Sequence, residues 1–174
     1  MLFNNCWLGG SSAMRQDAVL FFGGDKAVGY NAQQLQQREK ELKRALERTI
    51  PVKVGREAKN HFQDNFLKGG FVDKGLHPWQ RSKRQGTSKG AKGSYKTLLS
   101  GRNHLYSSIS YRAEPYRVTL TNDVPYARVH NEGLRAGRGK GFTMPRRQFM
   151  GDSPELHRVL REKIEKHLNK IIHK

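Results

Sequence analysis

Seven histidines are the residues of this chain that most directly suggest metal chemistry. Zinc sites need ligands at short, regular spacing, such as a His-x-x-x-His pair on one helix face or a cysteine nearby. The chain has no such pair, and its single cysteine, Cys6, lies far from every histidine. The sequence therefore predicts packing or surface roles and no metal site for His61, His77, His104, His130, His157, His167 and His173.

Ser100 and His104, four residues apart, suggest a nucleophile and its base. Members of a catalytic triad are seldom neighbours in sequence, and no Gly-x-Ser-x-Gly elbow surrounds Ser100. A serine at this place is a good N-cap for a short helix. We interpret Ser100 as a helix cap and expect no catalytic residues.

The glycines between Gly133 and Gly141 suggest a loop that cradles phosphate. They match neither the Walker A sequence nor a Gly-x-Gly-x-x-Gly run after a strand, so no cofactor is predicted. We interpret this stretch as a mobile basic loop.

Positive charge dominates the composition, because 33 Lys and Arg face 15 Asp and Glu, for a net charge of +18. Such a balance favours nucleic acid or an acidic protein surface as the partner. Much of this charge lies in segments 81–96 and 134–147, which could form one patch that contacts phosphate without sequence specificity. The candidate contact residues are Arg81, Lys83, Arg84, Lys89, Lys92, Lys96, Arg135, Arg138, Lys140, Arg146 and Arg147.

Location in the cell is constrained by what the sequence lacks. One cysteine excludes an intramolecular disulfide, which fits a reducing cytoplasm. No apolar run approaches the ~20 residues that a membrane span needs. Residues 1–10 carry no charge and make a poor signal peptide. We expect a cytoplasmic protein with no membrane contact.

Two helices are predicted in the first half of the chain. Leu35, Leu42, Leu46 and Ile50 recur at helical spacing from Asn31 onward, and Pro51 should break or bend that helix. Apolar residues at every fourth position predict a second helix over 52–68, which should end at Gly69-Gly70. Residues 71–96 show no period, and 81–96 has the composition of a mobile loop.

A β-hairpin and a terminal helix are predicted in the second half. Residues 109–113 and 116–121 alternate apolar and polar side chains, with Tyr116, Val118 and Leu120 on one face. Ser153 and Pro154 should start a helix whose apolar stripe runs from Leu156 to Ile172. The predicted fold class is α+β: a small antiparallel sheet with a β-hairpin, packed against N-terminal and C-terminal helices, with long mobile basic loops.

Residues 1–30 differ from the rest of the chain. Their apolar run, 18–22, is bounded by glycines and could form a strand. We interpret 1–30 as an N-terminal appendage, either disordered or the product of a mis-assigned start, since Met14 offers an internal one. Residues 31–174 are then the folded domain.

A short helix is predicted between Tyr126 and Gly133. Pro125 suits its first turn, Asn122 or Asp123 can cap it, and Gly133 can end it. Tyr126 and His130 lie one turn apart and should share a face, with Tyr126 packed in the core.

The segment from Tyr126 to Gly151 resembles the phage virion morphogenesis family, also called tail-completion proteins. The family's run of Tyr-Ala-x-x-His, a Gly, and then a Pro-x-Arg-x-Phe-x-Gly-like segment has its counterpart here, and the resemblance covers about residues 32–172. The matching positions are Trp79, Gly101, Tyr126, Ala127, His130, Gly133, Pro145, Arg146, Phe149 and Gly151.

The resemblance implies a structural subunit that completes the phage or prophage tail and joins it to the head as part of a homo-oligomeric ring. Its implied partners are phage tail, portal or connector, and tail-tube proteins. Its implied location is the host bacterial cytoplasm and then the head–tail junction of the virion. The alternative is a basic nucleic-acid-binding protein that makes non-specific DNA contacts through 81–96 and 134–147.

Overall fold

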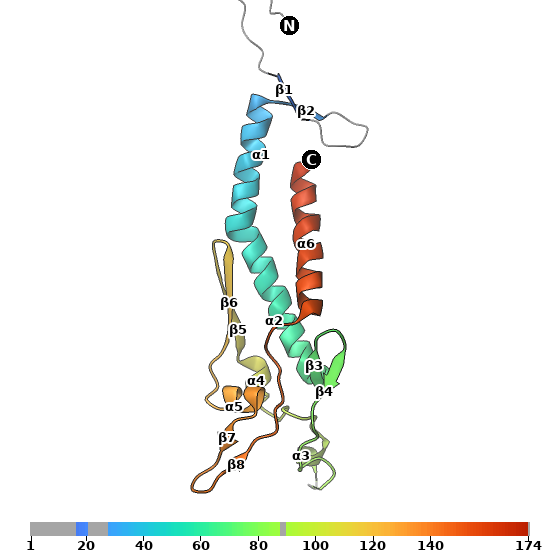
Figure 1. Cartoon of the computed structure of the whole chain (residues 1–174), viewed down its shortest axis with the longest axis vertical. Coiled ribbons are helices and arrows are strands. Elements are labelled where there is room, and N and C mark those ends of the chain that lie inside the picture. Colours follow the sequence, from blue (N-terminus) through green and yellow to red (C-terminus); the bar gives the residue numbers. More distant parts are fainter. Residues whose placement is uncertain (1–16, 21–27, 88–89, 174) are drawn as a thin grey trace, which may run out of the picture. The chain divides into compact units, whose positions relative to one another are not determined.

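The computed structural model describes residues 17–20, 28–87 and 90–173 of the chain (Figure 1). The chain divides into two compact units, one up to Glu41 and one from Leu42 onward. Helices are combined with two-stranded antiparallel sheets, which confirms the predicted α+β class. The predicted domain boundary at residue 30 stays a prediction.

The first unit contains an antiparallel hairpin of β1 (Asp17–Leu20) and β2 (Val28–Asn31), followed by the start of α1 (Ala32–Arg44). The strand predicted over 18–22 is confirmed for 18–20, and its last two residues lie outside the described part. Asn31 and Gln34 form a reciprocal cap: each backbone N–H donates to the other's side-chain oxygen, at 3.0 and 2.8 Å.

Of the two outcomes predicted at Pro51, a break is not observed, because the helical backbone continues through it into the next helix. A π-helical turn, η1 (Ala45–Thr49), connects α1 directly to α2 (Ile50–Lys68), and the backbone stays right-handed helical at Arg44, Thr49 and Ile50. Ile50 N–H donates to Ala45 O, five residues back. Because proline has no N–H to donate, a local change to π-helical bonding lets the chain pass Pro51 without ending the helix.

Helix α2 carries the core of the second unit. Ala58, Phe62 and Phe66 are buried on one face, as their four-residue spacing predicts. The helix ends at Gly69, whose φ of 72° places it in the left-handed region and whose N–H caps Asn65 O. The predicted end of this helix is confirmed.

Three further hairpins follow α2. Strands β3 (Gly70–Val72) and β4 (Leu76–Pro78) pair first, in a stretch where the sequence shows no period. Strands β5 (Ile109–Glu114) and β6 (Arg117–Asn122) form the predicted hairpin and contact α2. Strands β7 (Arg135–Ala136) and β8 (Phe142–Thr143) pair within the segment predicted to be a loop.

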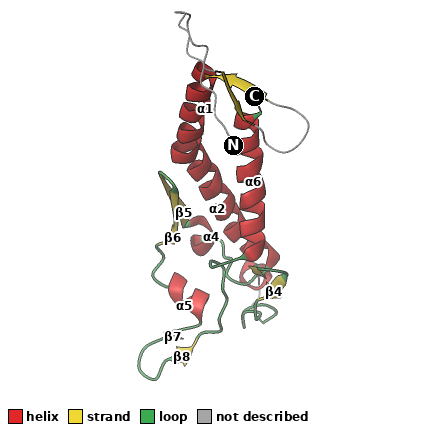
Figure 2. Ribbon diagram, turned by 45° about the horizontal axis from the view of Figure 1, so that its top comes forward, coloured by secondary structure: helices red, strands yellow, loops and turns green. Residues whose placement is uncertain are grey.

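Short helices and one long helix complete the second unit. The short ones are α3 (Ala91–Ser94), α4 (His104–Ser107) and α5 (Ala127–Glu132). The long helix, α6 (Pro154–Ile172), confirms the predicted terminal helix and runs beside α2 (Figure 2). The buried core joins α2, strands β3 and β5, the short helices α4 and α5, and α6. Its residues are Ala58, Phe62, Phe66, Phe71, Trp79, Leu105, Ile109, Ala127, Phe149 and Leu156.

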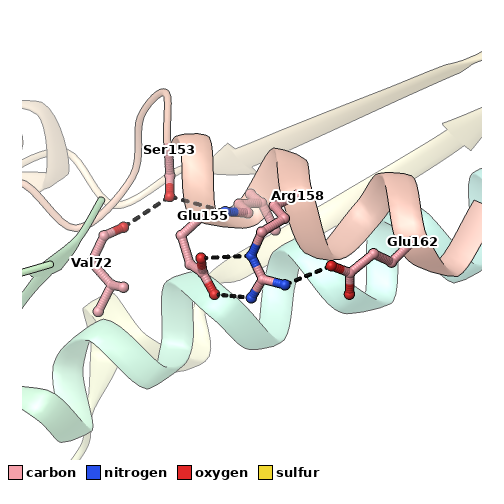
Figure 3. A network of polar contacts seen from close by, with 6 residues as sticks. Val72, Ser153, Glu155, Arg158 and Glu162 are labelled. Atoms are coloured by element: carbon pink, nitrogen blue, oxygen red, sulfur yellow. Dashed lines mark hydrogen bonds and ion pairs between the residues drawn. The ribbon is translucent and has the colours of Figure 1, made fainter. Parts of the chain in front are cut away.

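Ser153 fixes the start of α6 (Figure 3). Its side-chain oxygen accepts the Leu156 N–H at 3.2 Å, which is the predicted N-cap, and donates to Val72 O at 2.9 Å. Arg158 then holds Glu155 and Glu162 on the exposed face of the helix. Ser153 is fully buried, so one hydroxyl both caps the helix and joins it to β3.

Three predictions about the hairpin and its surroundings are wrong in detail. Tyr116 is no strand residue: it sits in the two-residue turn with φ 59° and is 66% exposed. Neither Asn122 nor Asp123 caps α5, which begins after Tyr126 without a side-chain cap. The side chain of Asn122 instead donates to Leu105 O and accepts Val124 N–H. Ser100 caps a turn rather than α4, because it exchanges hydrogen bonds with Asn103, the residue preceding that helix.

Candidate interaction sites

The two halves of the sequence motif, α5 and residues 144–150, lie against each other in the structure. Arg147 N–H donates to His130 O at 2.8 Å, and Met144 N–H donates to Leu134 O at 3.0 Å. We call this contact the motif seam, comprising residues 126–134 and 144–151. Residues 135–143 protrude between its two sides as hairpin β7–β8 (Figure 1).

Asn131 joins the two sides of the seam, although its sequence position gives no hint of this. Its side-chain oxygen accepts both Phe149 N–H and Met150 N–H, at 2.9 and 3.0 Å. These two backbone donors have no strand or helix to satisfy them, so the side chain takes that place. No local pattern in the sequence distinguishes Asn131 from a surface asparagine.

Gly133 is required where the two sides approach most closely. Its φ is 75°, and a Cβ there would lie 2.9 Å from Arg146 Cβ and 3.0 Å from Arg146 N. Both the left-handed backbone and the close contact exclude a larger residue. The predicted helix end at Gly133 is confirmed.

The seam is held against α2 by buried polar contacts. Trp79 donates its indole N–H to Gln148 O at 2.8 Å and packs edge-on against Phe66. Asn65, fully buried on α2, donates to Phe149 O at 3.1 Å and accepts Val72 N–H at 3.1 Å. Sequence reasoning missed Asn65, whose signal was a polar residue beside the apolar positions of α2.

Most of the remaining motif residues lie in the core, at a ring contact or in exposed turns. Phe149 and Ala127 are buried in the core. Tyr126 is 44% exposed and stacks edge-on with His130, so the prediction that it packs in the core is wrong. Pro145 is half-buried, while Gly101 and Gly151 are exposed in turns.

Two of the predicted basic contact residues, Arg84 and Arg147, are partly or fully buried. Arg147 is only 6% exposed and donates to Gln80 O at 2.9 Å. Arg84 is half-buried and donates to Leu99 O and Lys96 O. Gln85 donates to Tyr95 O and accepts from Thr97, so the turn at residues 82–87 is tied to residues 95–97. The mobility predicted for 81–96 stays a prediction.

Arg84 and Arg147 line one cavity of about 280 Å³ together with His130, Tyr126 and Ser100. Burial, and then the charge of Arg84, lower the pKa of Arg147. Burial, and then the charge of Arg147, lower the pKa of His130. The two predicted basic segments thus do converge, but they meet in a cavity instead of forming an open patch.

The other predicted contact residues lie mostly at the surface. Arg81, Lys83, Arg138 and Lys140 are exposed. Three more are exposed but bonded within the chain: Lys96 to Leu67 O, Arg135 to Lys140 O, and Arg146 to Gln148 Oε1. Lys89 and the side chain of Lys92 lie outside the described residues.

Hairpin β7–β8 presents apolar side chains as well as charge. Phe142 is 57% exposed and Leu134, at its base, is 38% exposed. A two-residue strand on each side provides little pairing, and Gly137, Gly139 and Gly141 all have positive φ. Exposed aromatic and basic groups on a small hairpin are typical of a surface completed by a partner.

A groove of about 330 Å³ separates part of α6 from α2. Lys163 pairs with Glu57 at 2.5 Å and Lys53 contacts His167 at 2.9 Å across it. Burial, and then the charge of Lys53, lower the pKa of His167. Of the apolar stripe on α6, only Leu156 is fully buried, so the later turns keep an apolar face that is partly open.

In the described ranges, no three His, Cys, Asp or Glu side chains gather as a metal site requires. Among the helices of those same ranges, none combines the length and apolarity needed to cross a membrane. The candidate sites in the described ranges are therefore exposed surfaces and the cavity lined by Arg84 and Arg147.

Comparison with known proteins bears on this arrangement directly. The model of the phage virion morphogenesis family matches residues 30–169, which include α1, α2, the seam and most of α6. Searches of curated proteins and of solved structures returned no match. Because the family model covers most of the chain, including both sides of the seam, the chain belongs to the phage virion morphogenesis family.

Proposed function

We propose that this protein is a structural subunit that completes the phage tail and joins it to the head as part of a homo-oligomeric ring. Family membership carries the proposal, since it gives the protein a role in virion morphogenesis. The role is non-catalytic and needs no cofactor. The partners are tail, portal or connector, and tail-tube proteins, met in the host cytoplasm and kept at the head–tail junction.

The unpaired sheet edges support assembly with other subunits. Every sheet in the described residues has two strands, so each strand has one edge without a strand beside it. Such edges can pair with a strand of a neighbour. The exposed apolar residues Phe142, Tyr116 and Leu76 lie on or beside these hairpins and would be covered by the same contacts.

A phage lysate lacking the protein tests the role in assembly. We expect heads and unjoined tails to accumulate, and added purified protein to restore joined particles seen by electron microscopy. Joined, infectious particles in its absence would exclude the proposal.

Mass measurement by light scattering tests the ring. We expect a discrete oligomer, alone or on tails, that Phe142→Ser weakens without changing the melting temperature. Asn60→Ala, at an exposed position of α2 outside the hairpin, is the control for a general surface change. A strictly monomeric protein, both free and tail-bound, would contradict ring formation.

The alternative is non-specific binding of DNA. The exposed cations Arg81, Lys83, Arg138 and Lys140 favour it, because phosphate contacts need accessible positive charge. A gel shift at rising salt separates the two functions: tight, salt-sensitive binding by a monomer indicates the alternative, whereas a ring with weak DNA affinity indicates the assembly role.

A further inference from the structure

The cavity that contains Arg84 and Arg147 has the features of a binding site that the chain itself leaves unfilled. It lies between the turn at 82–87, residues 97–100 and the motif seam. Arg147 belongs to the seam and Arg84 to the turn. The fold therefore brings two arginines that are far apart in sequence to the same cavity. The volume of about 280 Å³ is enough for one small polar group with its neighbouring atoms.

Positive charge in this cavity has no internal counter-ion. Among the described residues that line it there is no aspartate or glutamate. Arg147 nonetheless is 6% exposed, and the contacts it makes are to Gln80 O and, more weakly, to Met144 Sδ. A buried guanidinium ordinarily has a carboxylate partner, because removing the charge from water without one is costly.

Unsatisfied polar atoms point to the same place. In the described part of the chain, five buried side-chain nitrogen or oxygen atoms have no hydrogen-bond partner. Three of the five belong to residues lining this cavity: Ser82 Oγ, Arg84 Nε and His130 Nδ1. Arg84 Nε can only donate, and the other two can donate, so together they suit an acceptor with several lone pairs.

A carboxylate fits these donors better than a nucleic-acid backbone does. Guanidinium groups bind carboxylates and phosphates through paired, charge-assisted hydrogen bonds. Contact with duplex DNA, however, uses a row of accessible cations along the phosphates, and a nearly buried Arg147 cannot take part in one. A pair of arginines that lines one small, partly open cavity is suited to a single acidic group that enters from outside.

We infer that the Arg84–Arg147 cavity is an oxyanion-binding site that receives a carboxylate from an acidic segment of an assembly partner. This inference rests on the proposed function for the partner, but the binding chemistry can be tested on the purified protein alone. Tyr126, 44% exposed and lining the cavity, marks an accessible part of its wall. The partner's acidic side chain would thereby engage the family motif itself.

Titration with a blocked glutamate, N-acetyl-glutamyl-methylamide, followed by NMR of labelled arginine side chains, tests the site. Saturable shifts of the Arg84 and Arg147 signals are expected, and the neutral glutamine analogue should produce none. Arg147→Gln should weaken binding about tenfold or more. Arg138→Gln removes the same charge from an exposed position outside the cavity and should leave the affinity unchanged.

Three results would overturn the inference. Absence of saturable shifts would mean that only water occupies the cavity. An equal loss of affinity in Arg138→Gln and Arg147→Gln would indicate general charge screening. Tighter binding of inorganic phosphate or of a DNA oligonucleotide, lost in Arg147→Gln, would assign the site to phosphate rather than to a carboxylate.

A second pair of variants keeps the test decisive if Arg147→Gln does not fold. Ser100 lines the cavity and accepts Asn103 N–H, a bond that aspartate and asparagine can also accept. Ser100→Asp would supply the missing negative charge from within, and should raise the melting temperature and abolish glutamate binding. Ser100→Asn, of the same shape, should do neither, and a lower melting temperature in Ser100→Asp than in Ser100→Asn would contradict the inference.

The two proposals fail separately. A protein that forms rings and joins heads to tails, but shows no glutamate binding, would refute the oxyanion site alone. A protein that binds glutamate through Arg147, but leaves heads and tails to join without it, would refute the proposed assembly role alone.

Discussion

The motif seam and hairpin β7–β8 are consecutive in the chain but differ in what holds them. The seam has Phe149 buried in the core, Asn131 satisfying two backbone donors, and Gly133 in contact with Arg146. The hairpin has two-residue strands, and Phe142 is 57% exposed. The seam is therefore held by core packing and hydrogen bonds, whereas the hairpin leaves apolar and basic groups exposed.

Adjacent arginines show the same difference at the scale of one residue. Arg146 is exposed and bonds Gln148, while Arg147 is buried and bonds Gln80 O. Identical side chains thus have different surroundings because burial alternates over residues 146–149, where Arg147 and Phe149 are buried and Arg146 is exposed. Position relative to the core, and not residue type, separates structural from surface roles here.

Truncation of Phe149, the core aromatic of the seam, should separate the stabilities of seam and hairpin variants most strongly. Phe149→Ala removes a side chain that is 1% exposed and packs on Phe66, so we expect a loss of about 3–5 kcal/mol in unfolding free energy. Phe142→Ala in the hairpin should change it by less than about 0.5 kcal/mol. Urea unfolding measures both, and similar losses would show that the hairpin is part of the core.

The two glycine positions offer a second matched pair. Gly133→Ala must adopt a left-handed backbone and displace Arg146, for an expected cost of about 2–4 kcal/mol. Gly139→Ala also has positive φ but meets nothing within 4 Å, so only the backbone cost of about 1–2 kcal/mol applies. Equal melting temperatures for the two variants would refute the close contact across the seam.

Removing the asparagine of the seam should have a somewhat smaller effect. Asn131→Ala leaves Phe149 N–H and Met150 N–H without their acceptor, and should cost about 1–3 kcal/mol. Asn60→Ala, on the exposed face of α2, should lie within about 0.5 kcal/mol of the wild type. Thermal unfolding distinguishes them, and amide exchange at residues 149–150 should accelerate only in the Asn131 variant.

The smallest expected effect is a pH dependence of stability. Burial and Arg147 hold the pKa of His130 below its ordinary 6.5, so below pH 6.5 the unfolded chain binds a proton that the folded chain resists. Stability should fall as the pH drops below 6.5 and level off below the folded pKa. The pKa values of His61 and His167 are lowered too, chiefly by burial, and add to the trend.

His130→Gln should reduce this acid-side loss, measured as the change in melting temperature between pH 7.5 and pH 5. His77→Gln, an exposed position on β4, is the control and should keep the wild-type slope. A wild-type slope in the His130 variant would show that its imidazole does not resist protonation in the folded protein.

Regular elements were largely predictable because local patterns encode them. The four-residue repeat of α2, the alternation in β6 and the Ser153-Pro154 start of α6 each reflect which face must be buried or which N–H must be capped. The strands β3 and β4 were missed because each has three residues, too few for a period. The sequence left open whether Pro51 ends the helix or leads into the next one, because only the structure shows π-helical bonding that absorbs the proline.

The candidate sites were less predictable, since they depend on contacts between distant residues. Composition shows that segments 81–96 and 134–147 are basic. It does not show that Arg84 is half-buried and Arg147 buried in one cavity, while Arg138 is exposed. Asn65 and Asn131 were invisible as contributors because a side-chain amide shows its role only when the backbone it satisfies is known.

By itself, the sequence determined the fold class, the main helices and hairpin, the net charge and the family. The helices and the hairpin follow from local periodicity, the net charge follows from composition, and the family follows from motif residues in a set order. Only the tertiary structure decided that the motif is a seam, that two arginines share a cavity without a counter-ion, and that the intervening hairpin is exposed. Burial and hydrogen-bond satisfaction depend on which distant segments meet, and no local pattern specifies that.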